Sequence, residues 1–121
     1  MTESDLVSKC MKQIRMIPKT FCWKEHGGMY GTAGIPDIIV CANGRFIGLE
    51  VKLPGGRYGA TALQLKTIED IARAGGTAAV VRSVEEALQI VKEAMHYDDS
   101  ARADSGGAGM AGEIPDSKGR A

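Results

Sequence analysis

Two acidic residues and one lysine fall close together around a predicted β-hairpin. The dipeptide Asn43-Gly44 is typical of a two-residue hairpin turn, and an apolar run flanks it on each side. Pairing outward from this turn sets Asp37 opposite Glu50. Lys52 follows Glu50 by two residues, so its side chain points to the same face of the sheet. The sequence therefore predicts two carboxylates and an ammonium group on one face of the hairpin.

The same register predicts the rest of the hairpin. The expected cross-strand pairs are Ala42 with Arg45, Cys41 with Phe46, Val40 with Ile47, Ile39 with Gly48, and Ile38 with Leu49. The face opposite the carboxylates is apolar and is predicted to belong to the core, with the residues Ile38, Val40, Ile47, Leu49 and Val51.

Directly opposed like charges destabilise a hairpin, so the carboxylate pair needs a physical reason. A divalent cation between the carboxylates is the simplest one, because Mg²⁺ is often held by one or two carboxylates together with waters and phosphate oxygens. The alternative is an ordinary surface hairpin on which Lys52 forms an ion pair with Glu50 or Asp37. Both interpretations stay open on the hairpin alone.

The chain has 121 residues, enough for one domain with a modest core. Its 15 basic and 15 acidic residues give a formal net charge of +0, so the total charge does not indicate a polyanionic partner. Acidic residues gather at both ends, however, and a basic middle is compatible with nucleic acid. Ordinary solvated helix faces are the alternative explanation. The basic residues concerned are Lys9, Lys12, Arg15, Lys19, Lys24, Arg45, Lys52, Arg57, Lys66 and Arg73.

The cysteines and the hydropathy pattern indicate a compartment. Three cysteines without a pairing pattern, no signal peptide and no long apolar run predict a cytoplasmic protein with no membrane association. Cys10 and Cys41 lie in apolar patterns and are predicted to be small core residues. A zinc site from Cys22, His26 and Cys41 is not expected, because no close Cys/His spacing is present.

A helix and a strand are predicted before the hairpin. Apolar residues recur at helical spacing over residues 3–17, where Thr2 is a candidate N-cap with Asp5 three residues later. Pro18 ends this helix, and residues 20–24 are predicted to form a short strand.

A glycine-rich loop follows Lys52. It lacks the Gly-Lys-Ser/Thr ending of a phosphate loop, so no nucleotide cofactor is expected. The loop places Arg57 and Tyr58 at the mouth of the carboxylate face, where a guanidinium group suits phosphate and a ring suits base stacking. A solvated loop tip is the alternative.

The remaining pattern is helix, strand, helix. The second helix, 61–74, has Thr61 as its N-cap and ends at Gly75-Gly76. Strand 77–82 is apolar enough to be central, and its order after the hairpin predicts a parallel pair and therefore a mixed sheet. Ser83 and Glu86 form a capping-box pattern before the third helix. The predicted buried positions of these two helices are Leu65, Ile68, Ile71, Ala72, Ala87, Leu88, Ile90, Val91 and Met95.

The composition changes near residue 97, after which large apolar residues are nearly absent. The sequence therefore predicts a folded domain over residues 1–96 and a disordered tail over residues 97–121.

This order of elements resembles that of the PD-(D/E)xK restriction-endonuclease-like superfamily, and most closely its virus-type replication-repair nuclease branch (VRR-NUC). The matching positions are Gly34, Pro36, Asp37, Glu50, Lys52 and Gln64. The resemblance covers nearly all of the predicted domain. It implies an α/β fold in which helices flank a small mixed sheet, built from a central antiparallel hairpin and a parallel crossover strand.

The resemblance also implies residue roles. Asp37 and Glu50 would bind Mg²⁺ or Mn²⁺ together with the backbone carbonyl of Val51, and Glu3 matches a first-helix acid that reaches the metal in many members. Lys52 would position or help deprotonate the attacking water. Gln64 would orient Lys52 or that water. Contacts to nucleic acid would come from Lys9, Lys12, Lys24, Arg57, Tyr58 and Lys66.

The activity implied by the resemblance is a metal-dependent DNA endonuclease that leaves 5′-phosphate products. Small members of the branch are structure-selective, which implies branched or duplex DNA as substrate, a homodimer, and a bacterial or phage-encoded protein acting in DNA repair. Two alternatives remain at this stage: a nucleic-acid-binding module that kept the fold and lost turnover, and a small α/β interaction protein whose acidic pair is a coincidence.

Overall fold

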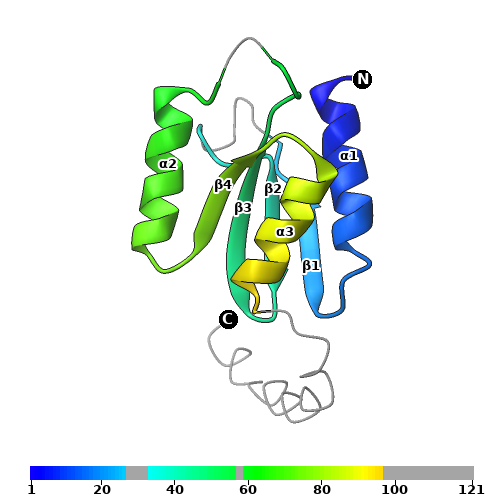
Figure 1. Cartoon of the computed structure of the whole chain (residues 1–121). Coiled ribbons are helices and arrows are strands. Elements are labelled where there is room, and N and C mark those ends of the chain that lie inside the picture. Colours follow the sequence, from blue (N-terminus) through cyan, green and yellow to red (C-terminus); the bar gives the residue numbers. More distant parts are fainter. Residues whose placement is uncertain (27–32, 57–58, 97–121) are drawn as a thin grey trace.

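The computed structural model describes residues 1–26, 33–56 and 59–96 (Figure 1). Arg57, Tyr58 and the predicted tail over residues 97–121 lie outside these ranges. In chain order the elements are α1 (Glu3–Ile14), β1 (Thr20–Lys24), β2 (Ile38–Ala42), β3 (Arg45–Val51), α2 (Ala62–Arg73), β4 (Thr77–Val81) and α3 (Val84–Ala94).

The four strands form one mixed sheet in the order β1-β2-β3-β4. β1, β2 and β3 are antiparallel neighbours, and β4 runs parallel to β3. All five cross-strand pairs predicted for the hairpin are present, from Ala42 with Arg45 at the turn to Ile38 with Leu49. Asn43 and Gly44 have φ values of 52° and 79°, as a two-residue turn of the favoured hairpin type requires. The predicted fold class is confirmed.

The core lies between one face of the sheet and the pair α1 and α3. Figure 1 shows α3 crossing in front of the strands, with α1 beside it. The five predicted core residues of the hairpin are fully buried there, because their side chains alternate with the opposite face of the strands. They pack with apolar residues of both helices, among them Leu6, Cys10, Ile14, Ala87, Val91 and Met95.

α1 begins as predicted and ends earlier. Thr2 and Asp5 form a complete capping box, with each side chain accepting a hydrogen bond from the other residue's backbone N–H. The helix stops at Ile14 instead of residue 17, because the backbone N–H of Ile17 bonds to Ile14 three residues back and Pro18 disfavours a helical residue before it. Ile17 is nevertheless buried, as its apolar pattern suggests.

α2 packs against β3 and β4 on the other face of the sheet. None of its residues is fully buried, so the predicted stripe is only partly correct. Ile68 and Ile71 are half-buried, whereas Leu65 and Ala72 are exposed. The helix covers a narrow part of this face, and a full apolar stripe has nothing to pack against there.

β4 lies at the edge of the sheet, so the prediction that it is central is wrong. Its apolar composition has another cause, because α2 and α3 both pack against it. After the strand, Ser83 accepts a hydrogen bond from the backbone N–H of Glu86, as predicted. The other half of the capping box differs, because the Glu86 carboxylate accepts from the backbone N–H of Arg82 and not of Ser83.

Two further predictions concern single residues and membrane association. Cys10 is buried, but Cys41 is exposed, because its side chain lies on the face of β2 away from the core. Cys22 is the second buried cysteine of the described chain. Among the described helices, none combines the length and apolar character needed to cross a membrane.

Candidate metal centre

The hairpin brings the two predicted carboxylates to the same end of the sheet. Asp37 directly precedes β2, and Glu50 lies one position beyond Leu49, the partner of Ile38. The Oδ2 atom of Asp37 accepts a hydrogen bond of 2.8 Å from the backbone N–H of Val51. This bond fixes the Asp37 carboxylate against β3, on the side from which Glu50 projects.

The Glu50 carboxylate is buried, with only 3% of the residue exposed. Its Oε2 atom accepts a hydrogen bond of 2.8 Å from Nε2 of Gln64 and lies 3.6 Å from Nζ of Lys52. Its Oε1 atom is also buried and has no hydrogen-bond partner among the described residues. A buried carboxylate oxygen without a partner is unfavourable, so this atom is available to a cation.

The environment raises the pKa of Glu50 from 4.5 to about 7. Burial is the largest cause, because it disfavours the charged carboxylate, and the nearby charge of Asp37 adds to it. Lys52 acts in the opposite direction and lowers the pKa, but it does not compensate for the other two effects. The site therefore has more negative charge than its own cation can balance.

Hydrogen bonds hold Gln64 at both ends of its side-chain amide and at its backbone N–H. Its Oε1 atom accepts from the backbone N–H of Thr61 at 2.8 Å, and its backbone N–H donates to the Thr61 hydroxyl at 3.1 Å. This capping box at the start of α2 leaves the amide Nε2 free to donate to Glu50. The resemblance assigned Gln64 to Lys52 or to the attacking water, and in the structure its Nε2 atom donates to Glu50, the partner of Lys52.

Two glycines let the segment before Asp37 pass between α2 and the sheet. Gly34 has φ of +86°, and a Cβ atom there would lie 2.8 Å from Cγ of Leu63 in α2. A Cβ atom on Gly48 in β3 would lie 2.8 Å from Cγ of Pro36. Larger residues at either glycine would displace the segment that delivers Asp37 to the site.

The chain beyond Lys52 is tied to β4. The backbone N–H of Lys52 donates to the carbonyl of Val81, and Nη1 of Arg82 donates to the carbonyl of Leu53 at 2.7 Å. Arg82 therefore holds the turn that directly follows Lys52. Sequence reasoning did not single out Arg82. Its signal is a basic residue at the end of the strand predicted to lie parallel to the strand of Lys52.

The other predicted site residues are placed less directly. Glu3 is exposed at the start of α1, and no third His, Cys, Asp or Glu of the described chain joins a cluster that could hold a metal ion. Lys66 forms an ion pair of 2.9 Å with Asp70. Lys24 lies 3.5 Å from the Ser4 hydroxyl. The remaining lysines, Lys9 and Lys12, are exposed on α1, which covers the face of the sheet opposite the carboxylates.

The donor atoms present fit a magnesium or manganese ion. Two carboxylates, one with a free buried oxygen, match the small number of protein ligands that Mg²⁺ requires when phosphate oxygens and waters complete its shell. Asp37 and Glu50 could therefore hold such an ion.

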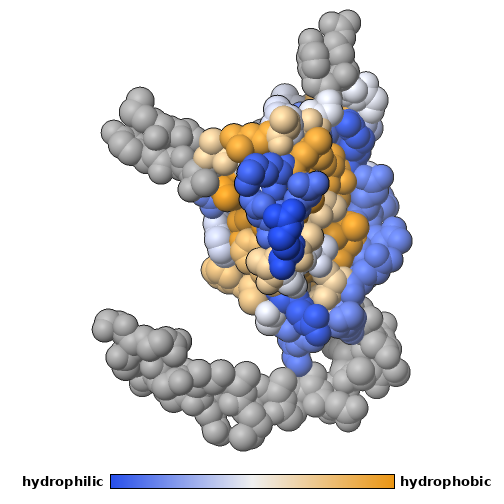
Figure 2. All heavy atoms as spheres, turned by 90° about the vertical axis from the view of Figure 1, so that its left-hand side faces the viewer, coloured by the Kyte–Doolittle hydropathy of each residue, from blue (hydrophilic) through white to orange (hydrophobic). Residues whose placement is uncertain are grey.

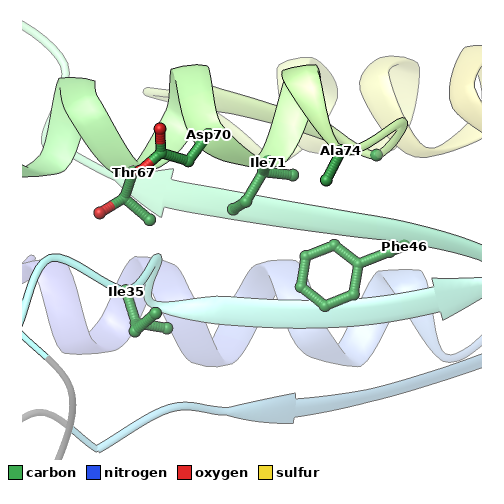
Figure 3. Close-up of a pocket in the computed structure, with 7 residues that line it drawn as sticks. Ile35, Phe46, Thr67, Asp70, Ile71 and Ala74 are labelled. Carbon is green, nitrogen blue, oxygen red and sulfur yellow. The ribbon is translucent and has the colours of Figure 1, made fainter.

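An apolar pocket lies on the same side of the sheet as the carboxylates of Asp37 and Glu50. It has a volume of about 510 Å³, and Figure 3 shows Ile35, Phe46 and Ile71 among its walls, between α2 and the strands. Phe46 precedes Glu50 by four residues on β3, a separation of about 13 Å along an extended strand. Figure 2 shows apolar surface flanking the polar outer side of α2.

Comparisons with known proteins test the fold. No protein-family model and no curated protein sequence matches the chain. Among solved structures, a "VRR_NUC domain protein" superposes with a TM-score of 0.63 at 20% sequence identity, over 82% of this chain and 92% of that one. A likeness at this identity concerns the arrangement of the elements. The chain has the fold of this VRR_NUC domain protein, with the small mixed sheet flanked by helices that its sequence predicts.

Proposed function

We propose that this protein is a metal-dependent DNA endonuclease. The observation that carries the proposal is the buried Oε1 atom of Glu50, which has no described partner and lies in a site shared with Asp37 and Lys52. A domain that only needed to fold would gain stability from an apolar or amide side chain at this position. Retention of a charged group there is reasonable if a cation binds it.

Asp37 and Glu50 would hold Mg²⁺ or Mn²⁺, with the backbone carbonyl of Val51 as a further ligand. A bound divalent cation supplies a Lewis acid that polarises the phosphodiester and lowers the pKa of the attacking water. Gln64 keeps the Glu50 carboxylate in one orientation through its 2.8 Å hydrogen bond. The bond from Val51 does the same for Asp37, so both acids are oriented before substrate arrives.

Lys52 supplies positive charge next to the carboxylates. Its ammonium group lies 3.6 Å from the Glu50 carboxylate. The Lys52 side chain is 14% exposed, which is compatible with contact to an incoming phosphate. We infer that it acts mainly as an electrostatic clamp on the phosphate and the attacking water, and less as a free-amine base. Arg82 supports it by holding the turn that follows.

We further propose that the nuclease domain spans residues 1–96 and that its substrate is branched or duplex DNA cut to give 5′-phosphate ends. One described site per chain serves one strand, so cleavage of both strands would need two sites, for which a symmetric homodimer is the simplest arrangement. A cytoplasmic role in DNA repair would follow, in a bacterial or phage-encoded setting.

The test is cleavage of end-labelled single-stranded, duplex and four-way-junction DNA by the full chain in Mg²⁺, Mn²⁺ or EDTA. Asp37→Asn should abolish metal-dependent cleavage, because the amide keeps an acceptor for the Val51 N–H and loses the charge. Glu69→Gln, an exposed position on α2, is the matched control and should cleave like the unaltered chain. Binding of DNA without cleavage in any metal would contradict the proposal and support a binding module.

A further inference from the structure

Two aromatic side chains stand exposed on β1. Phe21 is 67% exposed and Trp23 is 43% exposed, and their ring centroids lie 5.9 Å apart with an angle of 50° between the planes. Cys22, between them, is buried toward the core, so the two rings project from the opposite face of the sheet. This is the face that carries Asp37 and Glu50.

The rings continue the row of side chains that starts at the candidate metal centre. The backbone N–H of Glu25 donates to the carbonyl of Asp37 at 2.8 Å, which places Glu25 beside Asp37. Trp23 lies two residues before Glu25 and Phe21 two residues before Trp23. Each step is about 7 Å along an extended strand, so the first ring lies one step from the level of Asp37.

Apolar and uncharged residues occupy the two rows of the sheet that hold the rings. Trp23 pairs with Ile39 and through it with Gly48, and Phe21 pairs with Cys41, which pairs with Phe46. The indole N–H of Trp23 donates to Oε1 of Glu25 at 3.0 Å. The polar atom of the indole is therefore satisfied, and what the ring offers to a partner is its flat apolar face.

We propose that Trp23 and Phe21 form a stacking platform for unpaired bases of the DNA whose backbone reaches Asp37 and Glu50. This inference rests on the proposed nuclease function and specifies its substrate class, DNA with a single-stranded segment next to the scissile phosphate. Aromatic side chains on an open sheet are a common platform for single-stranded nucleic acid, because every base has a π-face.

The continuity of the platform with the carboxylates favours DNA over a protein partner. A strand whose phosphate lies at the metal centre has its neighbouring nucleotides within one or two base lengths of the rings. The carboxylates of Asp37, Glu50 and Glu25 repel phosphates that are not bridged by a cation, whereas the uncharged faces of the rings can stack with bases without that repulsion. The DNA backbone would thus contact the row of carboxylates, and the bases would contact the rows of the aromatic rings on the same face of the sheet.

The chain offers a direct probe, because Trp23 is its single tryptophan. Tryptophan emission of the full chain, titrated in EDTA with a 12-nucleotide oligothymidylate, reports this ring alone and does not require cleavage. Stacking predicts saturable quenching. Blunt duplex of the same length should quench far less, because its bases already stack on each other.

Variants test the contribution of the rings to affinity. Trp23→Leu and Phe21→Leu should each weaken binding of a labelled single strand by roughly tenfold, and Trp23→Phe should restore most of it. Leu65→Ala removes a comparably exposed apolar residue from α2, where no platform is proposed, and should leave affinity unchanged. Far-ultraviolet circular dichroism checks that each variant is folded.

The outcomes separate this inference from the proposed function. Metal-dependent cleavage without quenching, or with full single-strand affinity in Trp23→Leu, overturns the platform and leaves the nuclease standing. Quenching by a chain that cuts no substrate supports base stacking and overturns the nuclease. Emission that changes with protein concentration alone, together with a dimer that Trp23→Leu abolishes in sedimentation, overturns the platform and assigns the rings to self-association.

Discussion

Replacing Glu50 by glutamine should stabilise the metal-free protein at alkaline pH while abolishing the proposed nuclease activity. Glutamine keeps the shape of the side chain and an oxygen that can accept the hydrogen bond from Gln64, and it removes the buried charge. The pKa of Glu50 is raised from 4.5 to about 7, so the folded state prefers the protonated, neutral form. Ionisation of Glu50 is therefore a cost to the folded state, which the variant avoids.

The raised pKa sets the magnitude and the pH window. Below pH 4.5 the carboxyl group is neutral in both states and costs nothing; the cost grows between pH 4.5 and pH 7 and is complete above pH 7. A shift of this size corresponds to about 3 kcal/mol. We expect Glu50→Gln to raise the free energy of unfolding by about 2–3 kcal/mol at pH 8, and by less than about 1 kcal/mol at pH 5.

Urea unfolding in EDTA at pH 5 and pH 8 measures both values, with Glu69→Gln as an exposed control that should change neither. Addition of Mg²⁺ should then reverse the order, because an ion that binds only the folded wild-type site stabilises it by about 4.1 kcal/mol at a thousand times its Kd. A variant that is less stable than wild type at pH 8 in EDTA would refute the reasoning about the uncompensated charge.

Three other substitutions test how the site is held. Gly34→Ala forces an alanine into a left-handed backbone conformation and sets its Cβ atom against Leu63, so it should lower the free energy of unfolding by at least about 1–3 kcal/mol. Gly75→Ala should cost less, because its backbone is also left-handed but no atom lies within 4 Å of the added Cβ. Urea unfolding compares the two variants. Gln64→Ala should lower the cleavage rate and Thr61→Ala should not, although each removes part of the same cap and costs about 1 kcal/mol of stability. Arg82→Met should lower the single-turnover cleavage rate by about 10- to 100-fold with little change in DNA affinity, and Arg82→Lys should recover part of it; equal losses in rate and affinity would instead indicate direct phosphate binding.

The hairpin could be predicted because its register depends on local chemistry. Once Asn43 and Gly44 form the turn, each residue of β2 has one possible partner on β3, and a slip by one residue would turn the apolar side chains out of the core. The positions of the two carboxylates follow from the same count. This is why the central part of the site can be read from nineteen consecutive residues, 34–52.

Features that depend on how separate elements cover each other could not be predicted in this way. Cys41 has apolar neighbours in sequence and Leu65 lies at helical spacing from Ile68 and Ala72, but both side chains are exposed. The contact from Gln64 to Glu50 also depends on where α2 starts relative to β3. The capping role of Thr61 can be predicted from the sequence, but the direction in which the Nε2 group of Gln64 points cannot.

The arrangement around Glu50 links the stability of the domain to its proposed chemistry. The carboxylate is buried, receives one neutral hydrogen bond, and has an ammonium group 3.6 Å away. A shorter ion pair with Lys52 would neutralise the Glu50 charge within the protein. It would also weaken metal binding to Glu50 and draw the lysine away from the substrate phosphate. One buried oxygen is instead left without a described partner, and burial together with the charge of Asp37 raises the pKa of Glu50 to about 7. The fold thus accepts a local cost of a few kcal/mol, which the proposed binding of metal and phosphate would reverse.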